Sequence, residues 1–317
     1  IVLVLHHLIS DGYSFRVLTR DWLALYHGLK RDQPAALPPL ALQYGDYALW
    51  LERQLAESAL DGDRDYWLDQ LAGPLPRLDL SPLARPKNQT FVGAHFRRSM
   101  DRHQVARLES YAAQRNGTLF MGLLALVNTL LHRYTAAEDL LIGSPVAARN
   151  HSDLEDQIGF YGNTLVFRTR FKGSDTYATL FERVKQVTVA ALEHQAYPFD
   201  QLVDDLRPPK DTSRNALFDV AMVLQTETNS VRASGGGLQV RPYAGTYRVS
   251  SKFDLTFDFL LLADGLQLTL EYNTDLFSSE FITELYGHLE VLLATVARGQ
   301  DWTLNEDHHP EASLVGG

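Results

Sequence analysis

The sequence predicts a mixed α/β protein. Apolar segments rich in Val, Ile, Thr and Phe alternate along the chain with segments whose apolar residues recur every three or four positions. Strands that alternate with long helices are typical of an α/β sandwich, in which helices cover a sheet. The chain has 317 residues, of which 45% are hydrophobic and 21% charged, and this length is sufficient for two lobes.

Composition excludes several classes of partner and chemistry. The net charge is −10 and no dense Lys/Arg run occurs, which argues against nucleic acid or an anionic membrane as the main partner. The chain has no cysteine, so disulfides, thiolate metal sites and a cysteine nucleophile are excluded. The histidines lack metal-ligand spacing, and we expect no metal site. Because no signal peptide or spanning segment is visible, we expect a cytoplasmic protein.

The chain opens on Ile1–Leu5, an uninterrupted apolar run that predicts the end of a buried strand. A strand needs neighbours and none precede it, so we expect a fragment of a longer polypeptide. His6 and His7 follow. Because side chains alternate along a strand, they should point in opposite directions, one toward the core and one toward a cleft. A helical pattern then covers 14–30.

The rest of the chain alternates between helical segments, whose apolar residues recur every three or four positions, and apolar strand-like segments. Further helices are predicted at 44–58, 63–71, 101–115, 119–134, 176–195, 198–206 and 278–298. Strands are predicted at 91–100, 140–144, 161–171, 217–225, 251–262 and 265–272, with the last two joined as a hairpin and a Gly-rich loop at 230–237. The proline-bearing stretch 73–87 is the predicted boundary between lobes. We therefore divide the chain into 1–86, 87–300 and a frayed tail, 301–317.

The His6–Gly12 stretch carries the most chemical information. Imidazole titrates near neutral pH and suits proton transfer. Asp11 lies four residues beyond His7, where it either orients the imidazole or binds an arginine and locks the loop. Gly12 permits close approach of the backbone to a ligand. The alternative is a core histidine pair followed by an ordinary Asp-Gly turn.

Three further residues are candidates for the same site. Arg149 follows the predicted strand 140–144 and is either the partner of Asp11 or a solvated loop arginine. Asn163 either binds a substrate carbonyl or satisfies the end of a strand. Ser144, the last residue of strand 140–144, is also assigned to substrate binding.

The stretch His6-His7-Leu8-Ile9-Ser10-Asp11-Gly12 resembles the His-His-x-x-x-Asp-Gly motif of nonribosomal peptide synthetase condensation domains. The resemblance covers nearly the whole chain, in the order of the family's motifs. The further matching segments are 44–50, 66–67, 149–150, 158–161, 163–166, 198–203 and 213–218.

The resemblance implies two chloramphenicol-acetyltransferase-like α/β lobes in a V, with the active site at their junction and the first lobe truncated here. It implies peptide bond formation between a donor acyl or peptidyl thioester and the amine of an acceptor aminoacyl thioester. Both substrates would be held by donor and acceptor peptidyl carrier proteins on phosphopantetheine arms, beside an adenylation domain. No cofactor would be bound by this chain itself.

The resemblance also implies roles for single residues. His7 would be catalytic, either as a base or by positioning the amine, and His6 would support the loop. Asp11 would be structural and paired with Arg149, and Gly12 would lie close to the reacting groups. Two positions depart from the family pattern, because Gly162 stands where valine is usual and Ala148 where glycine is usual.

Three alternatives remain open. An epimerization domain has the same fold, but the segments 158–165 and 198–203 look like those of condensation domains. A non-catalytic recruitment module would keep the fold and bind a partner enzyme, although the intact motif argues against it. A free-standing acyltransferase would use coenzyme A and need no carriers. A heterocyclizing domain is a further relative, but such domains carry aspartates in place of the histidines, which argues against that activity here.

Overall fold

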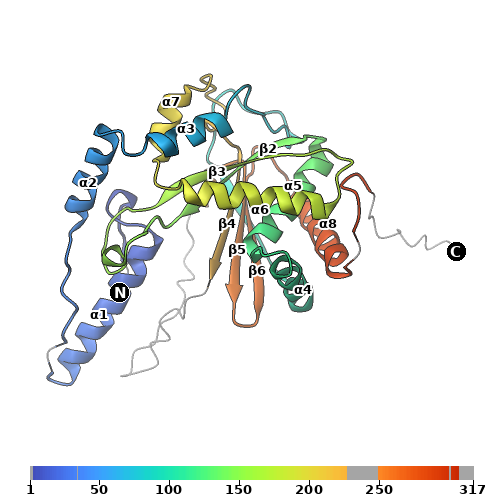
Figure 1. Cartoon of the computed structure of the whole chain (residues 1–317). Coiled ribbons are helices and arrows are strands. Elements are labelled where there is room, and N and C mark those ends of the chain that lie inside the picture. Colours follow the sequence, from blue (N-terminus) through green and yellow to red (C-terminus); the bar gives the residue numbers. More distant parts are fainter. Residues whose placement is uncertain (1–2, 34, 227–248, 300, 307–317) are drawn as a thin grey trace.

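The computed structural model describes residues 3–33, 35–226, 249–299 and 301–306. A mixed six-stranded sheet lies at its centre, with long helices packed against it (Figure 1). The strands are β1 (Gly93–Met100), β2 (Asp139–Val146), β3 (Asn163–Arg170), β4 (Val220–Thr226), β5 (Leu255–Leu262) and β6 (Gly265–Asn273). The helices are α1 (Gly12–Lys30), α2 (Tyr44–Ala56), α3 (Asp61–Gln70), α4 (Arg102–Ala113), α5 (Leu119–Thr135), α6 (Tyr177–Glu193), α7 (Phe199–Leu206) and α8 (Ser279–Ala297), with short 3₁₀ turns η1 (His7–Ile9) and η2 (Ser152–Leu154).

The strand order is β1-β6-β5-β4-β2-β3. The β5–β4 and β4–β2 pairs are parallel, and the remaining pairs are antiparallel. The β5–β6 pair is the predicted hairpin, with Phe257 opposite Leu270 in its register. Along β5 the residues Leu255, Phe257 and Phe259 are buried while the intervening side chains lie on the other face. This period of two is the alternation that the sequence shows.

The helices begin where the sequence supplies capping side chains. Asp101, Thr118, Thr176 and Ser278 each accept a hydrogen bond from the backbone N–H three residues ahead, at the starts of α4, α5, α6 and α8. A side-chain oxygen at this position satisfies one of the free N–H groups of the first turn. Helix α5 is buried on most faces, as its apolar sequence predicts, and forms the centre of the core.

The N-terminal segment does not form the predicted buried strand. Residues 3–6 have no regular secondary structure, and Leu3 and Val4 are 51% and 87% exposed. The prediction is wrong for these residues because none of the described strands pairs with them, and a strand exists only through such pairing.

Helix α1 confirms the helix predicted at 14–30, but much of its apolar surface is exposed. It buries Val17 and Leu23, whereas Trp22 and Leu29 are 36% and 84% exposed. In Figure 1 this helix lies beside the sheet rather than on it.

The segment after α8 packs against the body of the protein. Trp302 stacks on Tyr177 with ring centroids 5.4 Å apart, and Leu304 is fully buried. Thr303 forms a bridge with Thr176. The prediction of a frayed tail is therefore wrong for residues 301–306, because it overlooked two large apolar side chains. Residues 307–317 and the Gly-rich loop 230–237 lie outside the described residues.

Helix α3 contributes to the same core as the sheet. Its Trp67 is 1% exposed and donates a hydrogen bond to the carbonyl of His194, and Leu71 and Leu80 are also buried in the core cluster. These residues precede the predicted lobe boundary at Pro86, and the division of the chain into lobes stays a prediction. Within the described segments, no helix is long and apolar enough to cross a membrane.

Candidate active site

The two histidines lie in a short turn ahead of α1. His6 caps η1, and its Nδ1 accepts a hydrogen bond from the Leu8 N–H at 3.1 Å. His7 Nδ1 lies 2.7 Å from the carbonyl oxygen of Ser10. Both histidines are exposed, so the prediction that one of them faces the core is wrong. The alternation of a strand does not apply, because these residues form a turn.

The hydrogen bonds distinguish the two imidazoles. A carbonyl oxygen only accepts, so His7 Nδ1 must carry the hydrogen, and in the neutral ring Nε2 has the free lone pair. His6 Nδ1 accepts, so its hydrogen lies on Nε2. Of the two, His7 alone presents a basic nitrogen away from the loop. Its ring also meets the ring of Phe160 edge to face, with centroids 5.1 Å apart.

Asp11 and Arg149 form the predicted ion pair. The Arg149 Nη2 atom lies 3.1 and 3.2 Å from the two Asp11 carboxylate oxygens, and the side chains are only 2% and 9% exposed. Asp11 also caps α1, accepting hydrogen bonds of 2.7 Å from both the N–H and the hydroxyl of Ser14. The N–H of Tyr161 donates a further hydrogen bond to Asp11, at 3.2 Å.

The environment of Asp11 favours its charged form. Burial acts to raise the pKa of its carboxyl, but the Ser14 hydrogen bonds, the positive charge of Arg149 and the Tyr161 N–H together outweigh burial. The net effect holds the pKa of Asp11 below its ordinary value.

Arg149 ties the loop 147–162 to the histidine turn. Its guanidinium donates to the carbonyls of Leu154 and Gln157, the latter at 2.9 Å. It lies between the rings of Tyr13 and Tyr161, 4.7 and 4.2 Å from their centroids. Arg149 is therefore a buried structural residue and not a solvated loop arginine.

Ser14 and Gly159 complete this connection, and sequence reasoning missed both. The Ser14 hydroxyl oxygen accepts a hydrogen bond from the Gly159 N–H at 3.1 Å and lies 2.8 Å from the Gly159 carbonyl oxygen, which shares the single Ser14 hydroxyl hydrogen with Asp11. A side chain on Gly159 would overlap the ring of Tyr44, which a Cβ would approach to 2.4 Å. The spacing of Asp11 and Ser14 is a capping-box pattern, a signal that predicts the role of Ser14.

The side chain of Asn163 makes hydrogen bonds to backbone groups within the protein. Its Nδ2 donates to the carbonyls of Gln195 and Tyr197 at 2.9 and 2.7 Å, and its Oδ1 accepts from the N–H groups of Thr164 and Phe199. No side-chain donor is left for a substrate carbonyl. Asn163 therefore joins β3 to the start of α7. It also lines the groove described below, and its assignment to substrate binding stays a prediction.

The remaining two candidates are Gly12 and Ser144. Gly12 is the first residue of α1 and is exposed. Apart from its chain neighbours and the backbone of its own helix, no described residue comes within 4 Å of the place where a Cβ would lie. Ser144 is 3% exposed inside β2, opposite Leu165. Its role in substrate binding stays a prediction.

A groove of about 640 Å³ lies next to this network. Helix α2, the loop 147–162 and the start of α7 form its walls. Most of its lining is apolar or aromatic, and the aromatic members are Tyr44, Tyr47, Trp50, Phe160 and Tyr161. Gly162 and Ala148, the two positions that depart from the family pattern, both line it.

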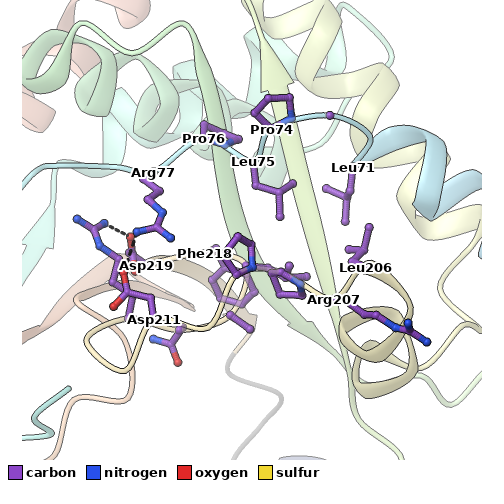
Figure 2. Close-up of a pocket in the computed structure, with 17 residues that line it drawn as sticks. Leu71, Pro74, Leu75, Pro76, Arg77, Leu206, Arg207, Asp211, Phe218 and Asp219 are labelled. Carbon is purple, nitrogen blue, oxygen red and sulfur yellow. Dashed lines mark hydrogen bonds and ion pairs between the residues drawn. The ribbon is translucent and has the colours of Figure 1, made fainter. Parts of the chain in front are cut away.

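A second pocket, of about 380 Å³, lies between the segments 71–77 and 206–219 (Figure 2). None of the predicted site residues lines it. Arg77 pairs with Asp211 at 2.8 Å, and Arg214 pairs with Asp219 at 2.6 Å. Burial and the negative charge of Asp254 raise the pKa of Asp219, against the lowering effect of Arg214. These pairs join distant segments of the chain, and we interpret the pocket as structural.

The described residues contain no group of three or more His, Asp or Glu side chains placed to hold a metal ion.

Comparison with known proteins identifies the family. A family model of the condensation domain matches residues 1–311. The chain belongs to the condensation domain family of nonribosomal peptide synthetases. It is 37% identical to surfactin synthase subunit 1 of Bacillus subtilis (strain 168) over 303 residues, which are 95% of this chain and 8% of that protein. It is 36% identical to bacitracin synthase 3 of Bacillus licheniformis over 98% of this chain and 5% of that protein. The chain thus spans only a small part of these relatives.

Solved structures agree with the fold. A complex of the X-domain and OxyB from teicoplanin biosynthesis superposes with a TM-score of 0.84 at 26% identity, over 96% of this chain and 69% of that chain. The condensation domain of the monacolin K polyketide synthase MokA gives a TM-score of 0.80 at 20% identity, over 94% of this chain and 69% of that chain. The predicted chloramphenicol-acetyltransferase-like α/β fold is confirmed.

Proposed function

We propose that this condensation domain forms a peptide bond between two carrier-bound substrates and that His7 carries the chemistry. The observation that carries the proposal is the hydrogen bond from His7 Nδ1 to the Ser10 carbonyl, which leaves Nε2 as the basic nitrogen of an exposed side chain. Nearby, Gly12 leaves open space at the start of α1. Membership in the condensation domain family supports this type of reaction.

The reaction needs little from the protein beyond placement. The amine nitrogen of the acceptor aminoacyl thioester attacks the donor thioester carbon, the C–N bond forms and the C–S bond breaks. The proton that the amine loses ends on the released pantetheine thiol. His7 Nε2 accepts a hydrogen bond from the amine and takes its proton, or holds the amine for attack. A thioester is already activated, and holding two tethered substrates together supplies much of the rate.

The remaining residues of the site hold this turn. Asp11 and Arg149 connect the start of α1 to the loop 147–162, which places Phe160 against His7. The substrates would arrive on the phosphopantetheine arms of donor and acceptor carrier proteins, next to an adenylation domain. The chain itself would bind no cofactor.

A single-turnover assay tests this function. The chain, within its complete polypeptide, is mixed with a donor carrier and an acceptor carrier, each loaded with an aminoacyl thioester, and intact-protein mass spectrometry follows the acceptor. We expect the condensed dipeptide on the acceptor carrier. Transfer from acyl coenzyme A without a donor carrier would instead establish a free-standing acyltransferase. Inversion of the donor residue without an acceptor would establish an epimerization domain.

A non-catalytic recruitment module is the second candidate. The structural match to an X-domain that was solved in complex with OxyB favours it. Under this alternative, the assay would yield no transfer from any loaded donor, while a carrier or partner enzyme would still bind.

A further inference from the structure

The aromatic groove and His7 share one wall. The ring of Phe160 meets the ring of His7 edge to face at 5.1 Å, and Phe160 also lines the groove. The hydroxyl of Tyr44, from the opposite wall, donates to the Phe160 carbonyl at 3.0 Å and fixes that segment. A group bound in the groove would therefore lie one side chain away from the proposed catalytic imidazole.

The groove has the size and lining of a small-molecule site. Its volume of about 640 Å³ lies within the range of about 300–1,000 Å³ that is typical of ligand pockets. Its aromatic side chains pack against one another, with Tyr47 and Tyr161 ring centroids 4.7 Å apart and Tyr44 and Tyr161 5.2 Å apart. Such packing gives a rigid wall with a large apolar surface.

Gly162 leaves this groove open. A Cβ placed on Gly162 would meet only the Val146 carbonyl at 3.5 Å and the Phe160 ring at 4.0 Å, both ordinary van der Waals distances. The backbone there is not in the left-handed region, so it accepts an L side chain. A Cβ is therefore accommodated at this position, and a larger side chain would take up space in the groove that Gly162 lines.

The lining also includes negative charge. Glu52 of α2 and Asp200 at the start of α7 both line the groove and are exposed. Within the part of the chain that the structure describes, neither carboxylate forms an ion pair with a basic side chain. Two such carboxylates favour a neutral or basic occupant and oppose an acidic one.

We propose that this groove binds the side chain of one of the carrier-bound substrates. This side chain is large, has mostly apolar surface and carries no negative charge, and Gly162 sets its size limit. The inference rests on the proposed function, because it takes its occupant from the substrates of that reaction.

The test compares substrate selectivity in the single-turnover assay. Phenylalanyl and alanyl thioesters are varied first on the donor carrier and then on the acceptor carrier, with wild type, Gly162→Val and Gly62→Val. Gly62 is a matched control, since it lies in α3, outside the groove, with nothing within 4 Å of its Cβ position. We expect Gly162→Val to lower the ratio of phenylalanyl to alanyl transfer at least tenfold in one of these two arms of the assay, donor or acceptor. That arm identifies which substrate places its side chain in the groove. The control should keep the wild-type ratio.

The outcomes separate the inference from the proposed function. Continued alanyl transfer with an unchanged ratio in both arms would overturn the inference alone. No transfer by wild type with any pair would overturn the proposed function and the inference with it. If Gly162→Val fails to fold, Ala48→Leu narrows the groove from the exposed surface of α2 and should lower the same ratio.

The charge preference has its own readout. We expect a glutamyl substrate to be transferred at least tenfold more slowly than a glutaminyl one in the arm that uses the groove. The double variant Glu52→Gln, Asp200→Asn should reduce that difference. Equal rates for glutamyl and glutaminyl substrates in wild type would remove the charge preference from the proposal.

Discussion

Replacing Asp11 with alanine should destabilise the protein strongly. The substitution removes one partner of an ion pair whose side chains are 9% and 2% exposed, and it leaves the Arg149 charge buried without its counter-ion. Removing one partner of a buried pair costs about 3–5 kcal/mol. The same carboxylate is the N-cap of α1, a role typically worth about 1 kcal/mol. Since both losses concern one group, we expect about 3–5 kcal/mol in total, which lowers the melting temperature by on the order of 10 °C.

Thermal and denaturant unfolding, followed by circular dichroism, measure this change. The matched control is Asp156→Ala, because the Asp156 carboxylate pairs with Arg20 on the surface with 43% and 45% exposed side chains. An exposed pair is worth at most about 1 kcal/mol. Equal, small losses in both variants would refute the proposed lock between the histidine turn and the loop 147–162.

The pH dependence follows from the same carboxylate. Because the folded-state pKa of Asp11 is below its ordinary value, its contribution to stability is present above the unfolded-state pKa and is lost as the pH falls through the folded-state pKa. The stability difference between wild type and Asp11→Ala should therefore shrink below about pH 4. A difference that grows as the pH falls would contradict the assignment.

Three further variants test the packing around the site. Gly143→Ala should lower the free energy of unfolding by about 1–3 kcal/mol or more, because the new Cβ would approach the Phe218 ring to 2.0 Å. The control Gly287→Ala has open space at its Cβ position and should be neutral or stabilising. Equal effects of the two variants in denaturant unfolding would contradict the tight packing of β2. Ala148→Gly should stabilise the protein by roughly 1 kcal/mol, because Ala148 has a φ of 47°, and a lower denaturation midpoint would refute this. Asn163→Ala should cost about 1–3 kcal/mol by leaving backbone groups unpaired. A large rise in KM without loss of stability would contradict this structural role and support substrate binding instead.

The periodic parts of the fold could be predicted from the sequence. Helix α5 and the β5–β6 hairpin were identifiable because local patterns, capping residues and a turn all agree, as at Thr118 and Ala263-Asp264. The segment Leu3–Leu5 was mispredicted because strand formation depends on a partner, which local sequence does not encode. Trp302 and Leu304 were missed because two apolar residues in a polar segment give no periodic signal, although they complete the core beside α6.

The site could be predicted only where a motif identifies it. The pairing of Asp11 with Arg149, 138 positions later, follows from the family resemblance, since spacing alone leaves Arg149 open. The satisfied amide of Asn163 depends on backbone carbonyls from a distant loop, which sequence does not locate. The same limit applies to the groove, whose walls come from three segments brought together by folding.

Single-turnover transfer by His7→Ala, compared with wild type, tests the central claim most directly. His7 is exposed. Among the described residues its side chain makes one hydrogen bond, to the Ser10 carbonyl, and an edge-to-face contact with Phe160, so the variant should unfold at nearly the wild-type temperature. We expect condensed product on the acceptor carrier with wild type and a loss of at least about a hundredfold in rate with His7→Ala, the scale of general acid–base catalysis. Wild-type rates in the folded variant would contradict the assignment of the chemistry to His7.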